Sequence, residues 1–158
     1  METIDREILI EETRERNEIL LEQWKVYVQM ADNMSVRRSK SNSFFTTINT
    51  TIIGLISVSF FSNHRNLILI TGILISIAWI SSIRSYKILN NAKFKVINKI
   101  EESFPMQGFT EEWDELKKSK HIKLTSNETY VPIGFIIIYM ICLWNNSGAF
   151  IWLINLFK

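Results

Sequence analysis

The chain has 158 residues, which suffices for one domain, and its 18 Lys and Arg nearly balance its 16 Asp and Glu. A formal net charge of +2 with mixed signs gives no argument for nucleic-acid binding. A single cysteine, Cys142, excludes an intramolecular disulfide and argues against a thiolate metal site. The mean hydropathy of +0.08 averages charged stretches, residues 1–42 and 84–128, with apolar stretches almost free of charge.

Residues 1–42 are expected to form a cytoplasmic helix, because they lack the apolar core of a signal peptide and contain no proline. An apolar stripe at alternating spacings of four and three supports the helix: Leu20, Trp24, Tyr27, Ala31 and Met34. The stripe could pack on its own subunit or on another one. Since a chain this small offers little core to receive it, we expect the stripe to help hold a closed homo-oligomer of four to eight copies.

Two apolar segments, 44–61 and 67–83, contain no charged side chain and lie five residues apart. Eighteen helical residues span about 27 Å, close to the ~30 Å hydrocarbon core of a bilayer. Residues 43–83 therefore predict a transmembrane hairpin. Its loop, residues 62–66, carries one arginine, whereas Lys and Arg are frequent just before the first segment and just after the second. By the positive-inside rule the loop lies outside, and the amino terminus lies in the cytoplasm.

Polar residues within the hairpin are candidates for a pore lining or a helix contact. Four of them are predicted to share one face of the first span: Thr46, Asn49, Thr50 and Ser57. Asn49 requires a partner helix or water, because lipid satisfies none of its polar atoms. In the second span, Gly72 and Ser76 form a small-xxx-small pair that permits close helix approach. Packing within one subunit, packing between subunits and pore lining all stay open for these residues.

Residues 84–128 are expected to be cytoplasmic and helical. The second span should continue as one helix to Glu102, and Pro105 should then force an extended connection. A short helix is predicted over Glu111–Lys120, with Thr110 as its cap. Four basic residues follow the second span and are candidate contacts for an anionic signal, although their simpler role is to anchor the span: Arg84, Lys87, Lys93 and Lys95.

Residues 129–158 are expected to form a third transmembrane segment with an apolar tail. Its strongest part, Val131–Trp144, is short for a span, and Pro132 is expected in the first helical turn. One tilted helix could run through residues 145–148, or a short span could end there with the tail returning along the outer interface. We favour the short span, since Gly148 and two asparagines offer a natural break.

Catalytic motifs are scarce. His64 and His121 fall on opposite sides of the membrane in this topology, and the five glycines are too scattered for a phosphate-binding loop. An acidic cluster is best explained as the first turns of a solvated helix: Glu111, Glu112, Asp114 and Glu115. We therefore expect no enzyme, no cofactor and no metal site.

Two long blocks, Leu21–Thr50 and Trp79–Ile97, together with the run Phe109–Trp113, resemble the RipA-like family of small octameric bacterial integral membrane proteins. The resemblance covers about residues 19–140. It implies an all-α homo-oligomer in the bacterial cytoplasmic membrane and supplies no catalytic residues. Similar proteins also serve as membrane effectors in anti-phage systems, in which a partner nucleotidyltransferase makes a nucleotide or oligonucleotide signal.

Two functions fit these expectations. The first is a homo-oligomeric membrane effector, a gated pore or membrane-perturbing assembly controlled through its cytoplasmic helices. The alternative is a non-conducting scaffold or envelope-homeostasis protein that recruits a cytoplasmic partner.

Overall fold

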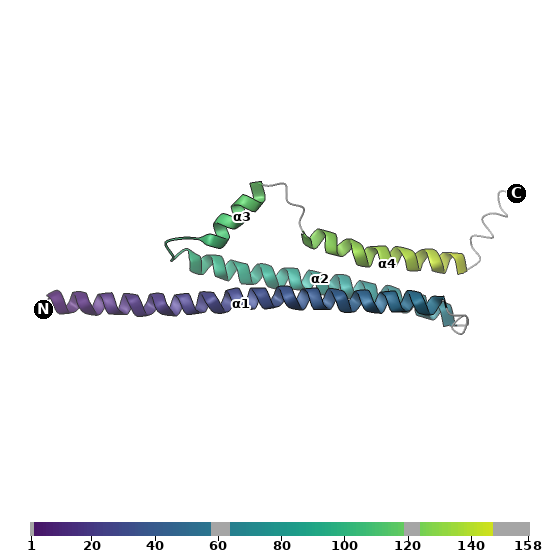
Figure 1. The fold of residues 1–158 in the computed structure, drawn as a ribbon, viewed down its shortest axis with the longest axis horizontal. Coiled ribbons are helices and arrows are strands. Elements are labelled where there is room, and N and C mark those ends of the chain that lie inside the picture. Colours follow the sequence, from purple (N-terminus) through teal and green to yellow (C-terminus); the bar gives the residue numbers. More distant parts are fainter. Residues whose placement is uncertain (1, 58–63, 119–123, 147–158) are drawn as a thin grey trace. The chain divides into compact units, whose positions relative to one another are not determined.

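The computed structural model describes residues 2–57, 64–118 and 124–146. Regular structure in these three ranges is helical throughout and comprises α1 (Glu2–Ile56), α2 (Arg65–Glu101), α3 (Gly108–Lys118) and α4 (Leu124–Asn146) (Figure 1). The expected all-α class is therefore confirmed. Among the described residues, α2 and the 128–145 part of α4 are long and apolar enough to cross a membrane.

Helix α1 is a single helix of 55 residues. The Ser-rich stretch 35–43 does not interrupt it, because the helix contains no proline and its first glycine is Gly54, in the last turn. The amino-terminal helix and the start of the first apolar segment are thus continuous. The end of that segment, 58–61, lies outside the described residues.

Helix α2 has 37 residues, about 55 Å, and is therefore longer than the ~30 Å hydrocarbon core. It ends at Glu101, in agreement with the expected long extension to Glu102. After it, backbone N–H groups of Ser103 and Phe104 donate to the carbonyls of Ile100 and Glu101, at 3.1 and 2.9 Å. These bonds turn the chain before Pro105.

Helices α3 and α4 both begin earlier than expected. Helix α3 starts at Gly108, so Thr110 lies inside it and is not its cap. Helix α4 starts at Leu124, so Pro132 lies inside it and not in its first turn. Residues before a proline prefer extended conformations, but this preference is not absolute, and α4 is helical on both sides of Pro132. The tail, 147–158, lies outside the described residues. The structure therefore does not test which of its two expected paths it follows.

The helices form two units, which are described separately. The first comprises residues 1–36 and 88–121. Its centre is an aromatic cluster of Trp24, Phe94, Phe104 and Phe109, with ring centroids 5.7–6.0 Å apart in three contacts. Ile97 and Ala31 are buried in the same unit, at 0% and 6% exposure. The stripe on α1 thus has a place within its own subunit, because α2 extends far enough to cover it. Contact of this stripe with a neighbouring copy stays a prediction.

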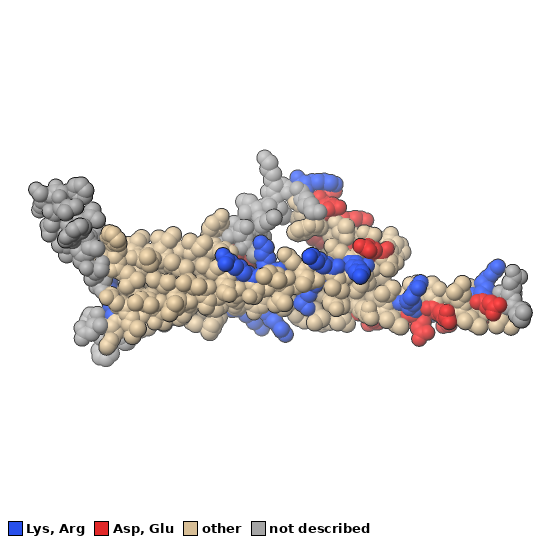
Figure 2. All heavy atoms as spheres, turned by 180° about the vertical axis from the view of Figure 1, so that it is seen from behind, with Lys and Arg blue, Asp and Glu red and all other residues tan. Residues whose placement is uncertain are grey.

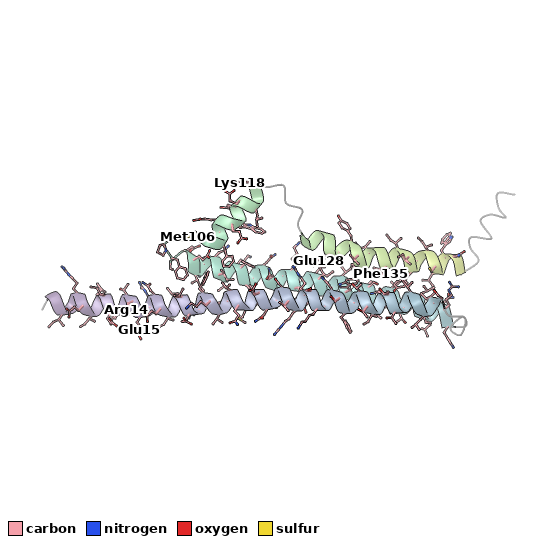
Figure 3. All side chains as sticks on the ribbon, viewed as in Figure 1. Arg14, Glu15, Met106, Lys118, Glu128 and Phe135 are labelled. Carbon is pink, nitrogen blue, oxygen red and sulfur yellow. The ribbon has the colours of Figure 1, made fainter. Side chains whose placement is uncertain are left out.

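The second unit comprises residues 37–87 and 122–158. Its described parts of α1, α2 and α4 run side by side, with α2 antiparallel to the other two (Figure 1). Ile52, Leu69 and Tyr139 form the buried core, and Cys142 is among the half-buried residues packed against it. Phe135 on α4 points toward α2 and contacts Trp79, with centroids 6.3 Å apart (Figure 3).

The outer surface of this unit suits lipid better than water. Only 28% of the apolar window in α2 and 11% of that in α4 are buried within the chain. A core helix of a soluble protein would be mostly buried. Figure 2 shows a broad area without Lys, Arg, Asp or Glu over the apolar parts of the helices. An apolar surface of this extent is the mark of a membrane-embedded protein.

Candidate functional site

The candidate site is a buried polar contact among three helices of the second unit. Asn49 on α1, Ser76 on α2 and Tyr139 on α4 each have 0% exposure. We call these three residues the polar triad. Their positions follow from helix periodicity, since each lies on the face of its helix that carries the neighbouring core residues.

Asn49 is the centre of the triad. Its Oδ1 accepts a hydrogen bond of 2.9 Å from the Ser76 hydroxyl. The Tyr139 hydroxyl lies 2.9 Å from the same Oδ1 and 3.1 Å from the Asn49 backbone oxygen, so its one proton serves two acceptors. Asn49 Nδ2 donates to the backbone oxygen of Phe45 at 2.9 Å. The amide is therefore satisfied inside the protein, as an asparagine in a membrane requires.

Gly72 makes room for this arrangement. A Cβ atom built on Gly72 would lie 2.6 Å from Tyr139 Cζ, closer than real Cβ contacts permit. The Tyr139 ring therefore fills a notch on α2 whose floor is Gly72 and whose next turn carries Ser76. This small-xxx-small pair is used within the subunit, and its use between subunits stays a prediction.

A second set of polar contacts involves residues 38–45 of α1, which precede Asn49 in the helix. Trp79 Nε1 donates to Asn42 Oδ1 at 2.9 Å, and the hydroxyls of Ser41 and Ser82 are 3.3 Å apart. Phe45 stacks on Trp79, with ring centroids 5.7 Å apart and planes inclined by 8°. An ion pair of 3.7 Å joins Arg38 on α1 to Glu128. Figure 3 labels Glu128 at the beginning of α4. Together these contacts link the three helices on the side where charged residues begin.

The other three residues predicted with Asn49 do not share its environment. Thr46, Thr50 and Ser57 are exposed, whereas Asn49 is buried, so the expected common face is not found. Each residue turns a helix by about 100°, which places residues 46, 57 and 50 about 60°, 80° and 100° from residue 49, all in the same direction around the helix. The three exposed hydroxyls bond to carbonyl oxygens four residues earlier, at 2.8–3.4 Å.

The exposed face of α1 is nevertheless distinctive. Within the part of α1 belonging to the second unit it carries small or hydroxyl-bearing residues, namely Ser43, Thr46, Thr47, Thr50, Thr51, Gly54 and Ser57. We call this set the threonine face. Phe44 and Leu55 flank it, at 61% and 36% exposure. The sequence pattern pointed to polar residues in this span but did not separate the inner asparagine from the outer hydroxyls.

The basic candidates on α2 are mostly accessible. Arg84, Lys87 and Lys95 are exposed, and Lys93 is half-buried. Their role as contacts for an anion stays a prediction. Among the described residues, no group of three or more His, Cys, Asp or Glu could hold a metal ion.

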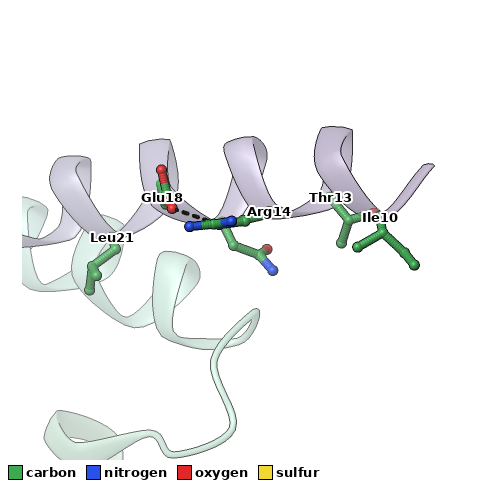
Figure 4. Close-up of a pocket in the computed structure, with 6 residues that line it drawn as sticks. Ile10, Thr13, Arg14, Glu18 and Leu21 are labelled. Atoms are coloured by element: carbon green, nitrogen blue, oxygen red, sulfur yellow. Dashed lines mark hydrogen bonds and ion pairs between the residues drawn. The ribbon is translucent and has the colours of Figure 1, made fainter. Parts of the chain in front are cut away.

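A shallow depression also lies along α1 (Figure 4). Its lining comes from one helix only: Ile10, Thr13, Arg14, Asn17, Glu18 and Leu21. Arg14 and Glu18 form an ion pair of 3.2 Å across it, with side chains 70% and 67% exposed. A solvated pair of this kind contributes little energy and brings together no catalytic groups.

The sequence singled out Asn49 and Ser76 of the polar triad but not Tyr139. Tyr139 carried no signal beyond being a tyrosine in an apolar segment, and its partner lies 90 residues away in the sequence. The Gly72–Ser76 spacing was the available clue to the notch. The hydrogen bonds of the triad join α1, α2 and α4 to one another, so its arrangement fixes these helices relative to each other.

A family model described as the octameric membrane protein family (8xMP) matches residues 21–147. No curated protein and no solved structure matches the chain. The matched range contains the polar triad, the threonine face and the aromatic cluster. It agrees with the octameric membrane protein implied by the sequence resemblance.

Proposed function

The chain belongs to the octameric membrane protein family, and we propose that it acts as a homo-oligomeric membrane effector in which copies of α1 surround a gated path. The assembly would lie in the bacterial cytoplasmic membrane with residues 1–42 in the cytoplasm. It would be non-enzymatic. Its activity would consist of permitting or blocking ion movement.

The observation that carries this proposal is the difference between the exposed faces of the three helices. On α2 the exposed residues are mainly aliphatic, with Leu67, Ile70, Leu74 and Ile77 at 47–64% exposure. On α4 they are again large and apolar, with Ile133, Ile137, Ile138, Met140 and Ile141 at 39–63% exposure. The threonine face of α1 has a different composition.

Lipid favours the aliphatic faces, because each apolar side chain removed from water contributes about 1.5–3 kcal/mol. The threonine face gains little from lipid, and its small side chains permit close helix approach. In a ring of eight subunits, α2 and α4 would then lie outward and α1 inward. The hydroxyls would face water or the α1 helix of a neighbouring copy.

Asn49 has a supporting role in this proposal. Because the polar triad is buried between α1, α2 and α4, it would hold α1 at a fixed rotation and so present the threonine face to the path. Control would come through the cytoplasmic helices, where the exposed basic residues Arg84, Lys87 and Lys95 of α2 suit an anionic signal, such as the product of a nucleotidyltransferase in anti-phage defence. The alternative is a scaffold of the same architecture that does not conduct.

The test compares two threonines that differ in which face they occupy. Thr50 on α1 and Thr71 on α2 are both exposed, and each hydroxyl bonds to the carbonyl four residues earlier at 2.9 Å. Thr→Val preserves shape and removes the hydroxyl. Thr50→Val is expected to change ion flux through octamers in liposomes, whereas Thr71→Val should leave it unchanged.

Mass measurement on the same samples must first show that both variants form octamers. Equal effects of the two substitutions on flux would contradict an α1-lined path. An absence of flux from wild-type octamers of verified size would favour the scaffold.

A further inference from the structure

Glu101 connects the last turn of α2 to the first turn of α3. Its backbone oxygen accepts from Phe104 N–H at 2.9 Å, within the turn that ends α2. Its side-chain Oε1 accepts from Phe109 N–H at 3.3 Å, at the second residue of α3. One residue therefore contacts both ends of the connection between the helices.

The side-chain contact replaces a local cap. The first N–H groups of a helix lack partners within it, and a carboxylate at that end is favoured by the helix dipole. Here the acceptor for Phe109 comes from another helix, while the Gln107 backbone oxygen accepts from Glu111 N–H at 3.0 Å. The beginning of α3 is thereby tied to α2 by a side chain and not only by the turn.

This contact also carries an opposing contribution. Glu101 is only 1% exposed, and its Oε2 has no hydrogen-bond partner among the described residues. Nearby, Trp24 contacts Phe104 and Phe109, and its Nε1 is likewise buried without a partner. A buried carboxylate oxygen without a partner disfavours the arrangement that buries it.

We propose that Glu101 is a latch that sets how firmly α3 docks on α2 and Trp24. Its acceptor oxygen and the aromatic cluster favour docking, while its buried charge opposes docking. Release of α3 would let water reach the carboxylate. The balance gives the first unit a conformational change through which the proposed membrane activity could be controlled, and this regulatory role rests on the proposed function.

The proposal is tested by hydrogen exchange of α3 in the intact octamer in nanodiscs, which does not depend on conduction. Glu101→Met removes the acceptor and is expected to speed exchange at 109–112 by about fivefold, as the loss of one helix cap does. Glu101→Gln keeps an acceptor and removes the charge, so exchange should be slower than in the wild type. Glu102→Gln, at the exposed neighbouring acid, is the matched control and should change nothing.

Amides of residues 68–83 in the second unit serve as the internal reference. Unchanged exchange in Glu101→Met, or equal acceleration in the Met and Gln variants, would overturn the latch. If Glu101→Met also loosens the reference amides, the decision rests on Glu101→Gln, whose failure to slow exchange would overturn it. Failure of ion flux with the expected exchange pattern would instead count against the pore alone.

Discussion

Gly72 lies directly beneath the ring of Tyr139, so closely that a methyl group on Gly72 would stand 2.6 Å from Tyr139 Cζ and 2.7 Å from Cε2. The neighbouring atoms belong to a ring whose hydroxyl is held by Asn49. The ring cannot retreat without breaking that hydrogen bond. Helix packing and intramembrane hydrogen bonding are therefore coupled at this position.

Gly72→Ala is expected to lower the stability of the second unit by about 1–3 kcal/mol, the usual effect of adding a methyl group to a filled core. Thermal unfolding in mild detergent measures it. Gly134→Ala on α4 is the matched control, because nothing lies within 4 Å of its added Cβ. Equal stability of the two variants would show that α4 does not pack on α2 in this register.

Tyr139→Phe should keep the ring in its notch and remove the hydroxyl bonds to Asn49. Polar contacts in membranes average about 0.6 kcal/mol, with a maximum near 1.7, so a small but measurable loss is expected. Tyr130→Phe, at 67% exposure on the same helix, should have no effect. A double-mutant cycle with Asn49→Leu should give a coupling energy, and a coupling of zero would argue against the triad.

Glu128→Gln is expected to destabilise the second unit, because it leaves Arg38 without its anionic partner. The Arg38 and Glu128 side chains are only 24% and 22% exposed. Glu115→Gln breaks an exposed pair with Lys118, whose side chains are 72–74% exposed, and exposed pairs contribute about 0–1 kcal/mol. Unfolding at low and high salt should show the larger and less salt-sensitive loss for Glu128→Gln; the reverse order would contradict the contact.

The orientation can be checked with single cysteines in a Cys142→Ser background. His64 and Glu111 are both exposed positions. The positive-inside rule predicts that a cysteine replacing His64 reacts with an impermeant reagent from outside, and one replacing Glu111 only after the cytoplasmic side is opened. Labelling of His64→Cys only from the cytoplasm would show that the orientation is the reverse of the predicted one.

Periodicity predicted much of this fold. The helical class and the long extension of α2 follow from local spacing, which a single sequence contains. The packing of the Leu20–Met34 stripe within its own subunit was not expected, because the cover that the end of α2 provides is a tertiary contact. Asn49 was singled out because an amide in an apolar segment demands a partner. Its actual partners could not be predicted, since Ser76 and Tyr139 are 27 and 90 residues away and many hydroxyls compete for the role.

Helix beginnings were predicted less well, also for a physical reason. Thr110 was a reasonable local cap, but a carboxylate from α2 satisfies the amide of Phe109 and lets α3 begin at Gly108. Likewise, Pro132 suggested the first turn of α4, although the polar residues before it are helical. A tertiary contact therefore sets the beginning of α3, whereas α4 begins before a proline that the helix tolerates.

The sequence separation within the polar triad has a consequence for biogenesis. Asn49 can meet Ser76 as soon as α1 and α2 have been made, but Tyr139 is made 90 residues after Asn49. At about 5–20 residues per second, that delay is roughly 5–18 s. During this delay the Gly72 notch is unfilled, and a helix of another chain can pack into it. Insertion of α4 is thus the step that seals the nascent subunit, and a chain truncated before Tyr139 would offer its neighbours an unfilled docking groove.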